Sequence, residues 1–254
     1  MRITLITGAD GAAFAHDLGT SLSPDDRLTV IAPTVRGHIS AGLLASPDLD
    51  GLLTPPGSAA TFATADALEA IGYAPRWQRA SDQAIAARIV RTDLTANGTS
   101  LTDATIAAAT RSGLPYRLLP ACEDRAEFRV VIGTDDPRAI HVEQYLADPA
   151  AHEATQLLLV ADQITISPAV AQALAETDVL VLGPSSRTLA IDPVLRTPRP
   201  PRADHRCPPD AGRPSRRPGP GRLVTVAGLS EPDPGRFETV PADAVLDHAR
   251  KVTA

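Results

Sequence analysis

The sequence predicts an α/β protein in which a mainly parallel sheet lies between helices in three layers, with an added helical layer. The first observation is a strand at residues 2–7 that alternates β-branched and other apolar residues and ends at a turn with two glycines. The second is a run of helix formers at residues 12–22, followed by another strand at 27–32. Such β-α-β units form parallel sheets with helices on both faces, so we expect a Rossmann-like domain.

The middle of the chain predicts the added helical layer, with helices at residues 63–71, 81–96 and 101–111. Ser81 stands where an N-cap belongs, and a glycine follows each run where a C-cap belongs. Apolar residues recur at helical spacing within the second run. We therefore expect the three helices to pack on one another.

The second half of the chain predicts more strands, at residues 116–119, 128–132, 140–146 and, as a buried strand, 157–161. Ser167 and Pro168 predict the start of a short helix that runs to residue 175, because proline is favoured at the first helical position. A strand at residues 179–182 follows. The strand and helix pattern thus resumes.

The composition divides the chain into three parts. Residues 1–195 are expected to form one α/β domain, and residues 196–222 contain eight prolines and eight arginines with almost no apolar side chains. We expect this linker to be disordered, because little burial offsets its ordering entropy; it also resembles a GC-rich gene read in a shifted frame. Residues 223–254 predict a short strand at 223–227 and a helix at 239–252.

The charge distribution argues against nucleic acid as a partner. The net charge is −6, and the linker carries +6, which leaves −12 on the rest of the chain. An acidic body repels phosphate backbones. No apolar run reaches the roughly 18 residues that cross a bilayer, and the N-terminus lacks a signal peptide, so we expect a soluble, cytoplasmic protein without a membrane partner.

Two short segments carry residues suited to chemistry. Gly8 and Gly11 lie between the first strand and the first helix, where backbone N–H groups can approach a phosphate, although Asp10 adds a negative charge. Asp48 and Asp50 lie in a predicted turn after the second strand, and such a pair can hold one hard cation. A structural turn in the first case and a solvated turn in the second remain alternatives. We expect asparagine at both acidic positions to leave the fold intact.

The order of these segments resembles the CofD/FbiA family of 2-phospho-L-lactate transferases of coenzyme F-420 synthesis. The family motifs GGVGGAK, NTGDD and CPDLDT correspond, in order and without gaps, to Gly8-Ala9-Asp10-Gly11-Ala12, Val30-Ile31-Ala32-Pro33-Thr34 and Ser46-Pro47-Asp48-Leu49-Asp50. Weaker matches continue to about residue 196, at Ser81-Asp82 with Arg91-Thr92, Leu118-Leu119-Pro120, and Gly183-Pro184-Ser185-Ser186 with Ile191-Asp192-Pro193.

The resemblance implies a transferase that moves a phospholactyl or phosphoenolpyruvyl group from a GDP-linked donor to a deazaflavin and releases GMP, with help from Mg²⁺. It implies a catalytic or metal-binding role for Asp48 and Asp50, and it allows a homodimer. The residues that it implies for substrate binding are Gly8, Asp10, Gly11, Thr34, Arg36, Asp82, Ser185 and Ser186.

Departures from the family pattern leave other functions open. Arg36 and Gly37 stand where the family has two acidic residues, so the site keeps at best half of its carboxylates, and Arg36 offers a fixed positive charge instead. A non-catalytic protein that binds a nucleotide or nucleotide sugar, such as a regulator or a pseudoenzyme subunit, is therefore the second hypothesis, and a nonfunctional remnant is the third. His38 and His141 are predicted to be isolated, and Trp77 to anchor the helical layer.

Overall fold

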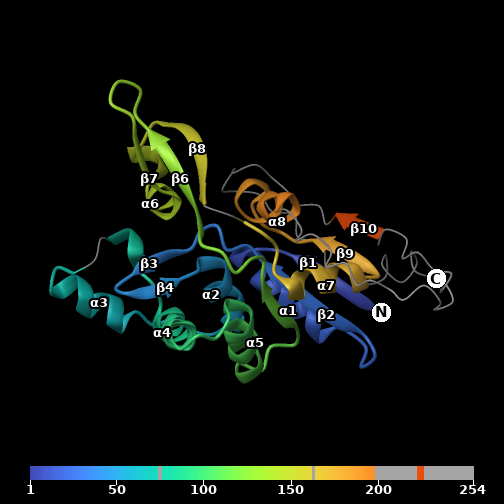
Figure 1. Cartoon of the computed structure of the whole chain (residues 1–254). Helices are drawn as coiled ribbons and strands as arrows, with labels where there is room; N and C mark the ends of the chain where they lie inside the picture. Colours follow the sequence, from blue (N-terminus) through green and yellow to red (C-terminus); the bar gives the residue numbers. More distant parts are fainter. Residues whose placement is uncertain (74–75, 162–163, 198–221, 226–254) are drawn as a thin grey trace.

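The computed structural model describes residues 1–73, 76–161, 164–197 and 222–225. At its centre is a parallel five-stranded sheet in the order β10-β9-β1-β2-β5 (Figure 1). Its strands are β1 (Arg2–Ile6), β2 (Arg27–Ala32), β5 (Arg117–Pro120), β9 (Val179–Leu182) and β10 (Arg222–Thr225). The predicted α/β class and the parallel sheet are confirmed.

Helices cover both faces of this sheet. Alternate strand residues point to opposite sides, and both sets are apolar here, so each face of the sheet packs against helices. The residues Leu5, Val30 and Leu118 face one core, whereas their neighbours in sequence, one position further along, face the other. The first core is closed by α1 (Ala12–Thr20), α2 (Pro47–Leu53) and α5 (Leu101–Arg111), and the second by α7 (Pro168–Glu176) and α8 (Asp192–Arg196). The three predicted layers are therefore present.

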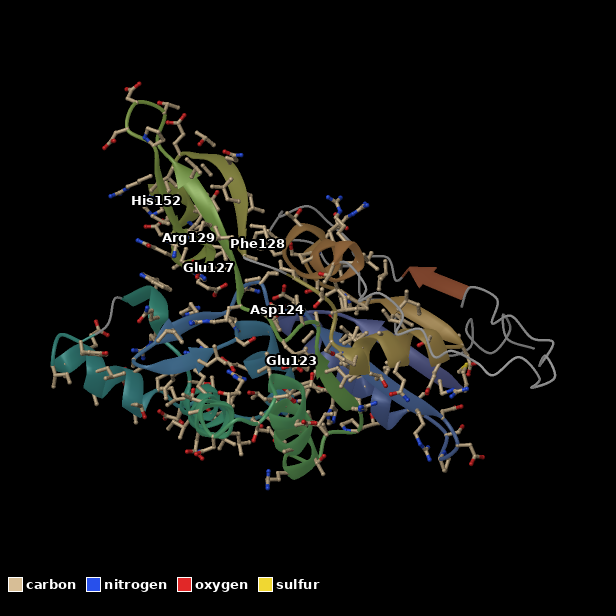
Figure 2. The ribbon with its side chains drawn as sticks, viewed as in Figure 1. Glu123, Asp124, Glu127, Phe128, Arg129 and His152 are labelled. Carbon is tan, nitrogen blue, oxygen red and sulfur yellow. The ribbon has the colours of Figure 1, made fainter. Side chains whose placement is uncertain are left out.

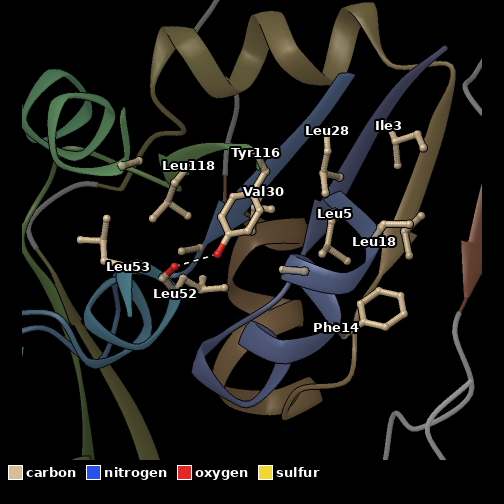
Figure 3. Packing of buried hydrophobic residues seen from close by; sticks show 14 of the residues in the cluster. Ile3, Leu5, Phe14, Leu18, Leu28, Val30, Leu52, Leu53, Tyr116 and Leu118 are labelled. Carbon is tan, nitrogen blue, oxygen red and sulfur yellow. Dashed lines mark hydrogen bonds between the residues drawn. The ribbon is translucent and has the colours of Figure 1, made fainter. Parts of the chain in front are cut away.

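The first core also ties α2 to the sheet through a polar contact. Phe14 and Leu18 of α1 belong to this core, and the Tyr116 hydroxyl donates a hydrogen bond to the Leu52 carbonyl over 2.7 Å (Figure 3). Burial raises the pKa of Tyr116 to about 12, so this hydroxyl keeps its proton and can donate. The carboxyl end of α2 is thus fixed against the segment that leads into β5.

The added helical layer consists of α3 (Ala63–Ala70) and α4 (Asp82–Ala96), beside α5. Ser81 Oγ accepts a hydrogen bond from the Ala84 N–H over 3.2 Å, which confirms the predicted N-cap. The glycines after α3, α4 and α5 have φ angles of 69°, 88° and 66°, as left-handed C-caps require.

A separate arm projects from the main sheet (Figure 1). It is an antiparallel sheet in the order β7-β6-β8, formed by β6 (Ala126–Ile132), β7 (Arg138–His141) and β8 (Ala154–Ala161), with α6 (Val142–Ala147) packed against it. The remaining elements are β3 (His38–Ser40), β4 (Leu43–Ala45), η1 (Ala9–Gly11), η2 (Arg76–Gln78), η3 (Pro149–Ala151) and the π-helical turn η4 (Arg187–Ile191).

The structure of the arm differs from the prediction for two strands. The strand predicted at 140–146 ends at His141, because His141 Nδ1 accepts a hydrogen bond from the Glu143 N–H over 3.1 Å and so starts α6. The strand predicted to be buried at 157–161 belongs to β8, which lies at the edge of the arm and, among the described strands, pairs only with β6. Its side chains are mostly exposed, and Leu159 is 47% exposed.

β10 is the element that the structure describes after residue 197. β10 confirms the strand predicted near 223–227, and it pairs in parallel with β9. Most of the predicted linker at 196–222 and the predicted helix at 239–252 lie outside the described residues, so the domain boundaries remain predictions. Within the described ranges, no helix has the length and apolar character needed to cross a membrane.

Candidate functional site

The candidate site lies where the strand order reverses. β1 pairs with β2 on one side and with β9 on the other, and the chain continues from β1 to a helix on one face of the sheet and from β9 to a helix on the other. Open α/β sheets bind ligands at such a point. Here the Gly8 N–H, directly after β1, donates a hydrogen bond to Ser185 Oγ over 3.1 Å. Two segments that the sequence indicated separately thus meet.

The first loop needs glycine at position 8 for close packing. A Cβ there would lie 2.5 Å from Asp48 Oδ1 and 2.8 Å from Ser185 Oγ. Gly11 is buried, and the space beside it is filled by the Thr7 side chain and the Pro184 carbonyl oxygen, 3.1 Å from the position of a Cβ. The glycines therefore let α2 and the loop after β9 approach the loop after β1.

The acidic pair lies in a helix rather than in the predicted turn. Pro47 occupies the first turn of α2, and Asp48 and Asp50 follow it, only 1% and 4% exposed. The expectation that both carboxylates lie outside the core is therefore wrong. Charged groups this deeply buried need partners, and each carboxylate has its own.

Asp48 links the glycine loop to Arg36. Its Oδ1 accepts one hydrogen bond from the Ala9 N–H over 3.0 Å and another from Arg36 Nη1 over 3.2 Å. Its Oδ2 is buried and has no partner among the described residues. Burial raises the pKa of Asp48 to about 6 although the Arg36 charge opposes this shift. The carboxylate is still mostly ionised at pH 7.

Arg36 links α2 to α6 at the centre of the site. Besides Asp48 of α2, it contacts Glu143 of α6, with Nε 2.6 Å from Oε1. Burial alone would lower the pKa of Arg36, but the charges of Asp48 and Glu143 outweigh it and raise that pKa. The exposed carboxylate of Asp10 adds to this effect. Arg36 is therefore the fixed positive charge that the sequence indicated.

Asp50 has a different set of partners. Arg88 Nε lies 2.7 Å from Asp50 Oδ2, and Arg91 Nη2 lies 2.5 Å from Oδ1. Arg91 also donates to the Leu44 carbonyl. Both oxygens of Asp50 are thus bonded to arginines of α4, and Asp50 fixes α2 against α4 and β4.

Asp82 lies at the start of α4, where its carboxylate caps another helix. It accepts hydrogen bonds from the N–H groups of Ala63 and Thr64 over 3.1 and 3.0 Å, at the start of α3. Hydrogen bonds from Thr61, Thr64 and Ala63 lower the pKa of Asp82 to about 2. Its proposed role in substrate binding remains a prediction.

Thr34 and Ser186 also have contacts within the protein. Thr34 is buried, with Oγ1 3.0 Å from Cys122 Sγ. Ser186 Oγ accepts a hydrogen bond from the Leu189 N–H over 3.2 Å and so caps η4. These contacts position the loops after β2 and β9, and a direct role of either residue in ligand binding remains a prediction.

Two adjacent cavities open beside neighbours of Arg36, since Gly37 lines the larger and Glu143 lines the smaller. The larger, about 850 Å³, is lined by Thr34, His38 and the base of the arm. Figure 2 shows that base, with Glu123 and Asp124 where the chain leaves β5 and Glu127 on β6; all three line this cavity. The smaller cavity, about 230 Å³, is lined by a set that includes His38, Asp50, Trp77, Arg88 and Glu143. His38 lines both cavities.

A cluster of three aromatic rings lies beside these cavities, and it was not predicted from the sequence. The ring centroids of His38 and His141 are 4.8 Å apart, and Trp77 lies 5.4 Å from the first and 5.9 Å from the second. The prediction that the two histidines are isolated is therefore wrong. Burial lowers the pKa of both, so both are neutral at pH 7. The three residues come from β3, η2 and β7, and no local pattern could have linked them.

His141 Nε2 makes only weak contacts, since the backbone of Gly37 and the carboxylate of Glu127 lie near the ring. His141 Nδ1 accepts the Glu143 N–H, so the neutral ring carries its proton on Nε2. That atom is buried without a hydrogen-bond partner in the described structure, 4.0 Å from Glu127 Oε2. A polar group left in this state favours a ligand or a water molecule nearby.

Comparisons with known proteins agree with the sequence motifs. A family model described as 2-phospho-L-lactate transferase CofD matches residues 8–203. The phosphoenolpyruvate transferases of Streptomyces griseus subsp. griseus and Kitasatospora aureofaciens are both 32% identical to the chain over 213 and 214 residues. These matches cover 78% of the chain and 67% and 66% of the relatives, so the chain spans about two thirds of their length.

A solved structure shows the same fold. The crystal structure of a member of the UPF0052 family from Bacillus halodurans superposes with a TM-score of 0.53 at 14% identity. The match covers 78% of this chain and 63% of that one. At this identity the likeness concerns the fold alone, and it supports the predicted Rossmann-like class.

Proposed function

The chain belongs to the CofD family of 2-phospho-L-lactate transferases, and we propose that it transfers a phosphoenolpyruvyl or phospholactyl group from a GDP-linked donor to a deazaflavin. The observation that carries the proposal is the contact of Gly8 with Ser185 and of Ala9 with Asp48 at the point where the strand order reverses. This is the place where an open α/β sheet binds a nucleotide diphosphate.

The proposed reaction exchanges one phosphorus–oxygen bond for another. The acceptor hydroxyl oxygen bonds to the phosphorus next to the three-carbon acid, the bond from that phosphorus to the oxygen of GMP breaks, and the hydroxyl loses its proton. Catalysis of such a step depends on positioning and on charge stabilisation. In this chain, Arg36 supplies the fixed positive charge, and Asp50 positions α2 through Arg88 and Arg91.

Asp48 is the residue that we propose for the proton transfer. Its Oδ2 has no partner among the described residues, and its pKa of about 6 leaves it ionised yet basic at pH 7. A carboxylate with a pKa near the working pH is suited to accept a proton. Asp50 is less suited, because both of its oxygens already bind arginines.

A specific observation favours the second candidate function, a non-catalytic protein that binds a nucleotide or nucleotide sugar. The N–H groups of Gly8 and Ala9 already donate to Ser185 and Asp48, and Arg36 already pairs with two carboxylates. Because these N–H groups and this arginine already have partners within the protein, the loops are held in place without a substrate. It would suit a regulator or a pseudoenzyme subunit.

The test is incubation of the full chain with a deazaflavin and a GDP-linked phosphoenolpyruvyl or phospholactyl donor. GMP is measured by chromatography and the product by mass spectrometry. We expect the native chain to form GMP and the deazaflavin product. We expect Asp48→Asn to slow the reaction by about 100-fold or more. Asp66→Asn, at an exposed site in α3, is the matched control and should retain the native rate.

The outcomes separate the candidate functions. Thermal stabilisation by GDP without any product would favour the non-catalytic protein. The absence of both product and stabilisation would contradict both candidate functions and favour a nonfunctional remnant.

A further inference from the structure

The acidic residues of the site do not fit the Mg²⁺ ion that the family resemblance implies. Three carboxylates, those of Asp48, Asp50 and Glu143, each bind at least one of three arginines. Their formal charges sum to zero, whereas Mg²⁺ prefers oxygen ligands that carry excess negative charge. In the part of the chain that the structure describes, no three His, Cys, Asp or Glu side chains are grouped to hold a metal ion.

The Arg36 guanidinium takes the position that a cation would need. It lies between Asp48 and Glu143, with nitrogen–oxygen distances of 3.2 and 2.6 Å, and its side chain is only 16% exposed. The two acids come from α2 and α6, which no other ion pair of the described residues connects. Without Arg36, two largely buried carboxylates would face each other across a gap.

An independent observation marks the gap as a ligand site. Asp48 is 1% exposed, and its Oδ2 has no hydrogen-bond partner in the described structure. A buried carboxylate oxygen without a partner is costly unless a cation or a donor lies beside it. Arg36 reaches only the other oxygen, Oδ1.

We propose that Arg36 is a built-in replacement for a divalent cation, so that the native chain binds no metal ion at this place and removal of the guanidinium opens a Mg²⁺ or Mn²⁺ site between Asp48 and Glu143. This inference concerns the protein without substrate, and it stands or falls independently of the proposed transfer. It predicts that Arg36 blocks metal binding and that Asp48 and Glu143 would provide the ligands.

The experiment is a titration with Mn²⁺, followed by the electron paramagnetic resonance signal of the free ion and by the thermal unfolding of the protein. We expect no binding to the native chain at millimolar Mn²⁺. We expect Arg36→Ala to bind one equivalent, at least about tenfold more tightly than the native chain, because a neighbouring positive charge has been removed. Mn²⁺ should also raise the unfolding temperature of this variant.

Three further variants control the experiment. Arg36→Lys keeps the charge and should not bind, Arg36→Ala combined with Asp48→Asn loses a ligand and should not bind, and Arg129→Ala removes a partly exposed arginine elsewhere and should behave as the native chain. If Arg36→Ala does not fold, Arg36→Ser with Mn²⁺ present during refolding takes its place.

Two results would overturn the inference. The first is binding of Mn²⁺ to the native chain as tightly as to the variant. The second is an Arg36→Ala or Arg36→Ser protein that folds and does not bind, or that folds neither with Mn²⁺ nor without it.

Discussion

Asp50 is held by Arg91 at 2.5 Å, with both side chains almost fully buried. The sequence placed this carboxylate in an exposed turn, where its replacement would not affect the fold. Instead, Asp50 is the only carboxylate that Arg88 and Arg91 contact in the described structure. Its role in holding α2 against α4 bears directly on stability.

We expect Asp50→Asn to lower the free energy of unfolding by about 3 kcal/mol, because it leaves two buried arginines without a negative partner. Urea unfolding followed by circular dichroism measures this change. Glu176→Gln breaks an exposed ion pair with Arg2 and should cost less than about 1 kcal/mol. Equal effects of the two replacements would contradict the buried role of Asp50.

We expect Gly8→Ala to abolish stabilisation by GDP and to lower the free energy of unfolding by about 1–3 kcal/mol, because the new Cβ would overlap Asp48 and Ser185. Thermal unfolding with and without GDP measures both effects. Gly72→Ala is the control, since its φ of 69° is strained for alanine but no atom lies near the Cβ. It should cost about 1 kcal/mol and leave the GDP response unchanged. A normal GDP response of Gly8→Ala would remove the first loop from the site.

The buried histidines make stability depend on pH. Because burial lowers the pKa of His38 and His141, the unfolded chain binds more protons than the folded chain as the pH falls below about 6.5. We therefore expect the free energy of unfolding to decrease from pH 7.5 to pH 5.5. His141→Asn keeps a capping acceptor for α6 and removes one titrating group, so it should reduce this decrease.

The native chain and His141→Asn must be compared because the titration of Asp48 changes the free energy of unfolding in the opposite direction. Its raised pKa of about 6 makes the free energy of unfolding decrease as the pH rises from about 4 to 6, and this contribution is common to the native chain and to His141→Asn. Urea unfolding at both pH values measures the difference. An unchanged pH dependence in His141→Asn would show that His141 does not titrate as its burial requires.

The parallel sheet could be predicted because each of its elements has a local signal. β9 and α5 begin and end at the predicted residues, and Ser81 caps α4 as its position before the apolar run indicated. Ser46 and Pro47 carry the same signal as Ser167 and Pro168, a capping residue followed by proline, and both pairs start a helix.

The contacts of the site could not be predicted, because they join residues far apart in the sequence. Glu143 is 107 positions from Arg36, and in a stretch of β-branched and aromatic residues nothing distinguishes it as the partner of an arginine. The strand predicted across it ends at His141 because a side-chain cap, rather than apolar spacing, sets the boundary. The ring cluster also depends on the position of the arm relative to β3.

Calorimetric titration of the full chain with GDP in the presence of EDTA, repeated with Mg²⁺, tests the central claim most directly. The contacts among Gly8, Asp48, Ser185 and Arg36 lead us to expect saturable binding of one GDP per chain, with a similar affinity under both conditions. The absence of binding in either solution would contradict the claim that these loops form a nucleotide diphosphate site.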